Sequence, residues 1–143
     1  MQGFPAATNG KQTWLAHCYA TLGAGRGNEA DSSNGTELYA VIGQSPRQLD
    51  RNITTVGHIW QGMEYLSVLQ RGTGPGGFYE KPEQTTPIKS IRLASTVPES
   101  ERINLEVFRT DTKTFDALVE SRRNRSDDWY LNKAGHIDVC NVP

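Results

Sequence analysis

The sequence predicts a mainly β protein of the α+β type, and three observations lead to this prediction. Several short stretches alternate apolar and polar residues, which is typical of strands with one buried face. Only two stretches carry apolar residues at helical spacing, and both are short. The chain has 143 residues, a length that suits one domain and allows a core to be buried.

Composition narrows the classes of partner. Fifteen basic and sixteen acidic residues nearly cancel, so neither a nucleic acid nor an anionic membrane surface is expected as a partner. No apolar run reaches the length of a membrane span. Residues 1–12 lack the basic and apolar regions of a signal peptide, so the sequence leaves the localisation of this chain unknown.

The first half of the chain predicts a loop and three strands. Residues 1–12 form the loop, and residues 13–22 form a strand. After a long loop at 23–35, residues 36–42 alternate with Leu38, Ala40 and Ile42 on one face. Gly43 and Pro46 end this second strand, and β-branched residues between Ile53 and Trp60 predict the third.

A short helix is expected next, because Gly62 precedes apolar residues at positions 63, 66 and 69. Gly72, Gly74 and Gly77 then fit the spacing of a dinucleotide-binding loop. We reject that interpretation, because the motif needs a strand before it and a helix after it. Residues 87–93 alternate and predict a further strand.

The last part of the chain predicts a strand near 105–108, a helix over 113–123 and a terminal hairpin over 129–139. Thr110, Asp111 and Thr112 offer N-cap residues for the helix. Arg122, Arg123 and Arg125 near its end suit the helix dipole. A solvated helix end is the preferred interpretation of these arginines, and a basic patch is the alternative.

The two cysteines have two possible states, and the cysteines and histidines together do not indicate a metal site or a nucleophile. Cys18 and Cys140 are either two buried thiols or a disulfide, which would require an oxidising compartment. The three histidines do not combine with them in the spacing of a zinc site, and no Cys–His nucleophile pair is indicated. We therefore expect neither a metal nor a cofactor.

The stretch from Gly35 to Met63 resembles the cyclophilin-type peptidyl-prolyl cis-trans isomerases. The family has a glycine, a polar residue, a glutamine and two phenylalanines in a pocket strand, and later a tryptophan-leucine-aspartate, an aromatic-glycine strand and a glycine-methionine. The corresponding segments of this chain are Gly35-Thr36-Glu37-Leu38-Tyr39, Gln48-Leu49-Asp50, Val56-Gly57-His58-Ile59, Trp60-Gln61 and Gly62-Met63. From Leu49 to Met63 the spacing matches that of the family without a gap.

Further segments resemble a group of bacterial, exported cyclophilin-type isomerases, so that the resemblance covers nearly the whole chain. They are Trp14-Leu15-Ala16-His17-Cys18-Tyr19, Gly25-Arg26-Gly27, Arg71-Gly72-Thr73-Gly74, Phe78-Tyr79-Glu80 and Cys140-Asn141-Val142-Pro143. Those proteins are longer at the N-terminus, so this chain looks like their C-terminal portion. A longer exported parent would be periplasmic or secreted, and a missing N-terminal half would be a partner.

The resemblance implies a fold and a domain division. Residues 1–97 would form the C-terminal part of an incomplete cyclophilin-like β-barrel, and residues 98–143 an α/β extension packed on it. A disulfide between Cys18 and Cys140 would pin the extension to the barrel. In the chain-entropy model it would add about 4–5 kcal/mol.

The resemblance also implies rotation of X-Pro bonds in proline-containing polypeptides, which assists their folding. Tyr39 and Leu49 would contact the proline ring, and Glu37 and Gln48 would stand at the pocket rim. Glu37, Gln48 and Ile53 replace a glutamine, a tryptophan and a histidine of the family. The family's catalytic arginine segment has no counterpart here, so the catalytic residue is unknown. A non-catalytic, peptide-binding module is the alternative.

Overall fold

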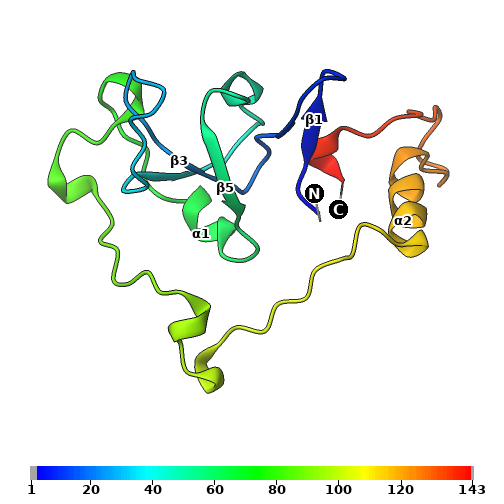
Figure 1. Ribbon diagram of the computed structural model, residues 1–143. Coiled ribbons are helices and arrows are strands. Elements are labelled where there is room, and N and C mark those ends of the chain that lie inside the picture. The colour runs from blue at the N-terminus through cyan, green and yellow to red at the C-terminus, as the bar shows by residue number, and fades with distance from the viewer. Residues whose placement is uncertain (1–2, 143) are drawn as a thin grey trace. The chain divides into compact units, whose positions relative to one another are not determined.

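A computed structural model describes residues 3–142 as an α+β fold with mostly sheet and two α-helices (Figure 1). The chain forms two units. The first combines residues 3–63 with 107–142, and the second is residues 64–106. The described residues form no closed barrel, so only the coarser prediction, a mainly β protein of the α+β type, agrees with the structure. The division predicted at residue 97 stays a prediction.

The first unit contains two antiparallel sheets. Strand β1 (Ala6–Thr8) pairs with β2 (Thr13–Leu15), so the loop predicted over residues 1–12 is wrong at Ala6–Thr8. In the second sheet, β3 (Thr21–Ala24) is the central strand, with β4 (Leu38–Ala40) on one side and β5 (Thr54–His58) on the other. The sheet is therefore held together through β3.

The single strand predicted over residues 13–22 is wrong, because β2 ends at Leu15 and β3 begins at Thr21. Ala20 adopts a φ of 67°, a left-handed conformation that lies outside the β region of regular strands. The backbone N–H of His17 donates to the side chain of Asp50 instead of to a neighbouring strand. Residues 16–20 thus form a turn between two sheets, in which Tyr19 is exposed and the other four residues are buried.

The predictions for the neighbouring elements are confirmed. Strand β4 lies within the stretch 36–42, and β5 lies within the stretch 53–60. The short 3₁₀ helix η1 (Arg47–Leu49) connects them. Helix α1 (Met63–Ser67) begins directly after Gly62, whose φ is 91°, a value that glycine adopts without steric cost.

The core of the described residues is small. Its buried apolar side chains are Ala16, Cys18, Ala20, Ala24, Val41, Met63 and Phe115. Two polar residues, His17 and Thr21, are buried among them. Buried polar groups need hydrogen-bond partners, so these two residues carry specific contacts.

Helix α2 (Lys113–Arg123) confirms the predicted C-terminal helix. The hydroxyl of Thr112 accepts a hydrogen bond from the backbone N–H of Phe115 at 3.2 Å, which satisfies one donor that the first turn leaves without a partner. Phe115 is buried, and Arg122 and Arg123 occupy the last turn.

Three predicted β elements are wrong: the strands at 87–93 and 105–108, and the hairpin at 129–139. Ile88, Ile91 and Leu93 are each more than 70% exposed. An alternating pattern forms a strand only where a second strand can pair with it, and none of the described strands pairs there. After α2, Asn124 accepts a hydrogen bond from the N–H of Gly135 at 3.1 Å, which organises this segment without strands.

The second unit consists mainly of extended chain with short 3₁₀ turns, drawn in green to yellow in Figure 1. These turns are η2 (Pro75–Gly77), η3 (Pro82–Gln84), η4 (Ala94–Thr96) and η5 (Glu99–Glu101). Phe78, directly after Gly77, is extended. The glycine cluster therefore lacks the following helix that a dinucleotide-binding loop requires.

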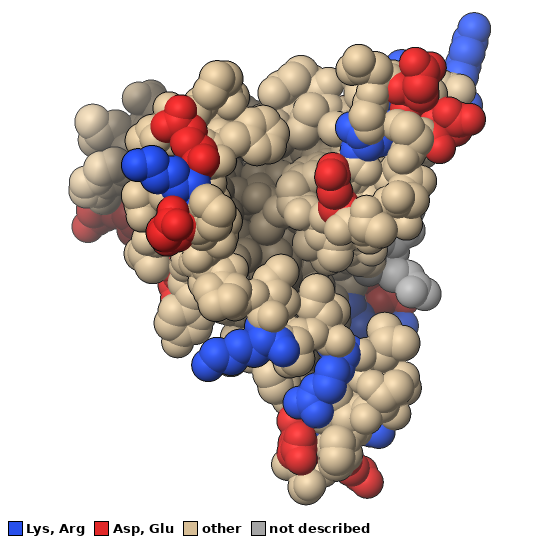
Figure 2. All heavy atoms as spheres, turned by 90° about the vertical axis from the view of Figure 1, so that its left-hand side faces the viewer, with Lys and Arg blue, Asp and Glu red and all other residues tan. Residues whose placement is uncertain are grey.

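Charge is mixed on the surface. Figure 2 shows one face on which basic and acidic side chains are interspersed, as the near balance of both signs in the sequence leads one to expect. None of the described helices has the length and apolar character to cross a membrane.

Candidate functional site

His17 is the centre of the most connected polar cluster of the described residues. Its side chain is fully buried, and both ring nitrogens have a partner. Nδ1 lies 3.0 Å from Oδ1 of Asp50, and Nε2 lies 2.7 Å from the hydroxyl of Tyr39. The ring therefore joins the loop after β2, the loop after η1 and strand β4.

Asp50 accepts four hydrogen bonds. Oδ1 receives the backbone N–H and the ring of His17, while Oδ2 receives Nε of Arg47 at 2.6 Å and Nε1 of Trp14 at 3.3 Å. Burial raises the pKa of Asp50, but the hydrogen bonds from His17, Arg47 and Trp14 outweigh it and leave the pKa below its usual value. The carboxylate is thus held in its ionised form.

These charges and donors define the hydrogen-bond directions in the cluster. An ionised carboxylate only accepts, so Nδ1–H of His17 donates to Asp50. Burial raises the pKa of Tyr39, so its phenol keeps its proton at neutral pH. In the neutral imidazole, Nε2 then accepts the hydrogen bond that the Tyr39 hydroxyl donates. The two hydrogen bonds therefore point the same way: Tyr39 donates to His17, and His17 donates to Asp50.

The ring of Tyr39 lies across Gly23, its partner in strand β3. A Cβ atom at Gly23 would stand 2.2 Å from Cζ of Tyr39 and 2.3 Å from its hydroxyl oxygen. Only glycine leaves room for this ring, and the ring must lie there to reach His17.

Replacing Gly23 by alanine is therefore expected to displace Tyr39 and to lower the free energy of unfolding by about 1–3 kcal/mol. Gly57→Ala in the adjacent strand β5 is the matched control. A Cβ there meets only Leu22, at 3.9 Å, so a change within about 0.5 kcal/mol is expected. Urea unfolding of both variants measures the difference. Equal losses would show that Tyr39 does not need the space over Gly23.

The four residues predicted to bind substrate have different surroundings. Tyr39 and Leu49 are half-buried, whereas Glu37 and Gln48 are exposed. The carbonyl of Glu37 accepts the N–H of Gly25 at 2.8 Å, which extends the pairing of β3 and β4. The structure connects Tyr39 to Asp50, the neighbour of Leu49, through His17. Among residues 3–142, no hydrogen bond joins Glu37 or Gln48 to His17, and their role stays a prediction.

Cys18 and Cys140 form a disulfide, with a Cα–Cα distance of 5.1 Å. This distance meets the requirement for a bridge. Cys140 belongs to the 3₁₀ helix η6 (Val139–Asn141), which Figure 1 shows beside β1. Cys140 Sγ lies 3.7 Å from the carbonyl oxygen of His17, so the bridge attaches the end of the chain directly to the polar cluster.

An apolar cavity of about 320 Å³ lies next to this disulfide. Phe4, Tyr19, Trp60 and Phe115 contribute aromatic walls. The ring of His58 makes an edge-on contact with Trp60, 4.7 Å between centroids, and burial lowers the pKa of His58. The cavity contains neither Tyr39 nor Leu49, so it is separate from the predicted substrate contacts.

Sequence reasoning missed His17 and Asp50 as a pair. Asp50 and His17 both belong to segments of the resemblance without an assigned role, and the histidines were otherwise weighed only as metal ligands or as partners of a cysteine nucleophile. The structure surrounds Asp50 with hydrogen-bond donors from Trp14, His17 and Arg47, and no sequence pattern indicates that these three residues lie close together. Their proximity depends on the turn at residues 16–20, which the sequence pattern did not show. Among residues 3–142, no three His, Cys, Asp or Glu side chains gather as a metal site would require.

Stability is expected to fall at acid pH through Asp50. The folded-state pKa of this carboxyl is lowered, so its contribution is complete above the unfolded pKa of about 3.9 and is lost as the pH falls through the folded pKa. We expect the difference in unfolding free energy between the wild type and Asp50→Asn to shrink from about pH 5 toward about pH 2. Urea unfolding across this range measures it, and a constant difference would contradict the assignment.

Comparison with protein-family models and with curated proteins finds no match to this chain.

Proposed function

We propose that this chain carries the proline-binding part of a cyclophilin-type peptidyl-prolyl cis-trans isomerase. One observation supports the proposal. The two segments that resemble the family's pocket, the strand with Tyr39 and the loop with Leu49 and Asp50, lie in one unit and are tied together by the buried ring of His17. Side chains that contact one proline ring need such a fixed arrangement.

The chemistry makes modest demands on the protein. The X-Pro bond rotates over a barrier of about 18–20 kcal/mol that amide resonance sets. An isomerase lowers it by binding the twisted bond more tightly than the planar one. This needs neither a metal nor a nucleophile. It needs an apolar surface for the ring and a donor for the prolyl nitrogen.

Tyr39 and Leu49 take the role of the apolar surface. Hydrogen bonding to His17 fixes the Tyr39 ring, and the carbonyl of Leu49 accepts the N–H groups of Asn52 and Ile53 at 2.9 and 3.1 Å, which holds the loop. Glu37 and Gln48 are the rim residues. No residue of this chain is assigned as the donor to the prolyl nitrogen.

Proline-limited refolding of a substrate protein tests this proposal. The disulfide-bonded chain should accelerate the slow phase, which without a catalyst takes tens to hundreds of seconds. Leu49→Ala should reduce the acceleration while leaving the circular dichroism spectrum unchanged. A slow phase equal to that in buffer, in a sample shown to be folded, would refute isomerase activity of the chain.

A non-catalytic peptide-binding module is the second candidate, and the edges of the larger sheet favour it. Among the described strands, β4 and β5 each pair on one side only. Exposed strand edges accept an extended peptide as an additional strand. Peptide binding that shifts the amide signals of β4 or β5 without accelerating refolding would favour this candidate over the enzyme.

A further inference from the structure

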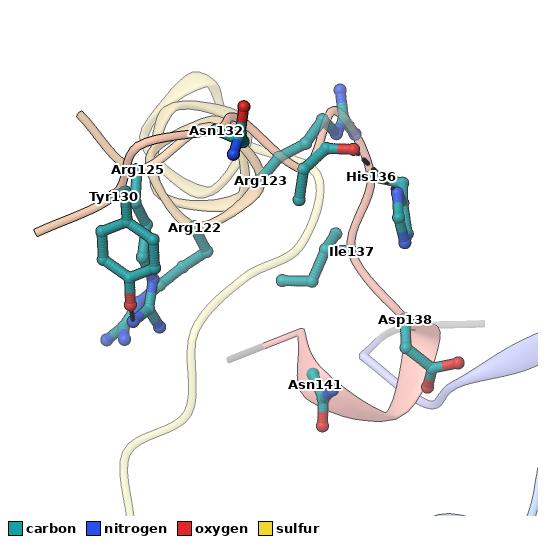
Figure 3. A pocket seen from close by; sticks show the side chains of 10 residues that line it. Arg122, Arg123, Arg125, Tyr130, Asn132, His136, Ile137, Asp138 and Asn141 are labelled. Atoms are coloured by element: carbon teal, nitrogen blue, oxygen red, sulfur yellow. Dashed lines mark hydrogen bonds between the residues drawn. The ribbon is translucent and has the colours of Figure 1, made fainter.

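An open hollow lies beside the C-terminal end of α2 (Figure 3). Neither Tyr39 nor Leu49 is among the residues that line it. Its volume is about 900 Å³. Arg122, Arg123 and Arg125 line it, together with side chains of the segment 130–141 that follows the helix. A space of this size holds several side chains rather than one small ion.

The positive charge in this hollow is only partly compensated. Arg123 forms an ion pair with Glu120 at 3.0 Å. Arg125 instead donates a hydrogen bond to the hydroxyl of Tyr130 and lies over its ring, 5.3 Å from the centroid. Within residues 3–142, neither Arg122 nor Arg125 has an acidic partner in an ion pair.

The one acidic residue of the lining does not cancel this charge. Asp138 caps η6, where its side chain accepts the N–H of Cys140 at 2.8 Å. Figure 3 shows Arg122 and Arg125 extending toward the Tyr130 hydroxyl, while Asp138 stands at the opposite end of the hollow. Two guanidinium groups therefore share one end, and no carboxylate of residues 3–142 forms an ion pair with either.

The helix dipole accounts for only part of this arrangement. The C-terminal end of a helix carries the equivalent of about half a negative charge, and its effect fades beyond the last turn. Arg125 lies after the C-cap residue Asn124. Half a charge cannot balance two guanidinium groups, so a positive surplus remains at this end of the hollow.

We propose that this hollow binds the carboxylate groups of an acidic polypeptide segment. A planar guanidinium group binds a carboxylate through two parallel hydrogen bonds. Arg122 and Arg125 supply two such groups. Asn132 and Asn141 offer amide donors and acceptors for a peptide backbone, and Ile137 offers an apolar contact. The proposal is independent of isomerase activity.

Fluorescence anisotropy with a labelled hexaglutamate peptide tests this site, with a hexaglutamine peptide as the uncharged control. The double variant Arg122→Gln/Arg125→Gln removes the two guanidinium groups. The charge-matched control is Lys11→Gln/Lys89→Gln, which removes two exposed lysines elsewhere. Circular dichroism and mass spectrometry confirm that each protein is folded and disulfide-bonded.

We expect the hexaglutamate peptide to bind the wild type and the lysine variant equally, and to bind the arginine variant at least about tenfold more weakly. In the wild type, the peptide should shift the amide signals of residues 122–141, a readout that does not depend on any variant. Equal binding to both variants, equal binding of hexaglutamine, or shifts confined to other residues would overturn the proposal. Displacement of the peptide by inorganic phosphate at lower concentration than by acetate would assign the site to phosphate instead and also overturn it.

Discussion

Replacing Asp50 by alanine is expected to lower the free energy of unfolding by about 3–5 kcal/mol. Its side chain accepts hydrogen bonds from His17, Arg47 and Trp14. Without it, the buried Nδ1–H and the backbone N–H of His17 lose their acceptor. A loss of this size is a large fraction of the stability of a typical domain, and it should lower the melting temperature by roughly 10–17 °C.

Asp111→Ala is the matched control for this experiment. Asp111 also pairs with an arginine, Arg109, at 2.7 Å, but both side chains are more than 60% exposed. Exposed ion pairs contribute little to the free energy of unfolding, because water and salt screen the two charges. Urea unfolding of the two variants compares a buried with an exposed carboxylate. Similar losses for Asp50→Ala and Asp111→Ala would show that the cluster around His17 does not hold the fold together.

Removing the disulfide is the second change with a large expected effect. The bridge joins residues that are 122 positions apart, and closing a loop of this length stabilises the fold by about 4–5 kcal/mol in the chain-entropy model. We expect Cys18→Ser/Cys140→Ser to lower the melting temperature by roughly 10 °C or more. The loss should be partial rather than complete, because the pairing of β3 with β4 and β5 involves neither cysteine.

Reductant provides the control for the disulfide. It should lower the melting temperature of the wild type to that of the double serine variant and leave the variant unchanged. Scanning calorimetry with and without reductant measures both effects. If reductant destabilised the variant as well, the effect would not come from this bridge. If the wild type were insensitive to reductant, the bridge would not contribute to stability.

Elements that depend on local sequence were predictable. Helix α2 follows from the cap at Thr112 and from the apolar spacing that buries Phe115. Strands β4 and β5 follow from alternation and β-branched residues. Each of these signals acts within a few residues, so the sequence pattern alone contains it.

Elements that depend on distant partners were not predictable. Residues 87–93 have a strand pattern but no strand beside them in the part of the chain that the structure describes. The turn that separates β2 from β3 needs the acceptor at Asp50, 33 residues away from His17. The sequence left the pairing of Cys18 and Cys140 open for the same reason, since no local pattern brings the two ends of the chain together.

The candidate site also combines residues that the sequence indicated with contacts between distant residues that it did not. The resemblance to cyclophilins pointed to Tyr39 and Leu49, but not to the buried ring that connects their segments. His17 could be recognised only when its two hydrogen bonds, to Asp50 at 3.0 Å and to Tyr39 at 2.7 Å, were visible in three dimensions.

Cis–trans exchange of a short proline peptide, followed by NMR magnetisation transfer, is the most direct measurement of the proposed proline site. The method detects catalysis without a coupled protease and without a substrate protein. With the folded, disulfide-bonded chain present, we expect exchange faster than the uncatalysed interconversion of tens to hundreds of seconds. Leu49→Ala should reduce this acceleration, whereas Asp111→Ala should not. An exchange rate identical to that of the free peptide would contradict the proposed function.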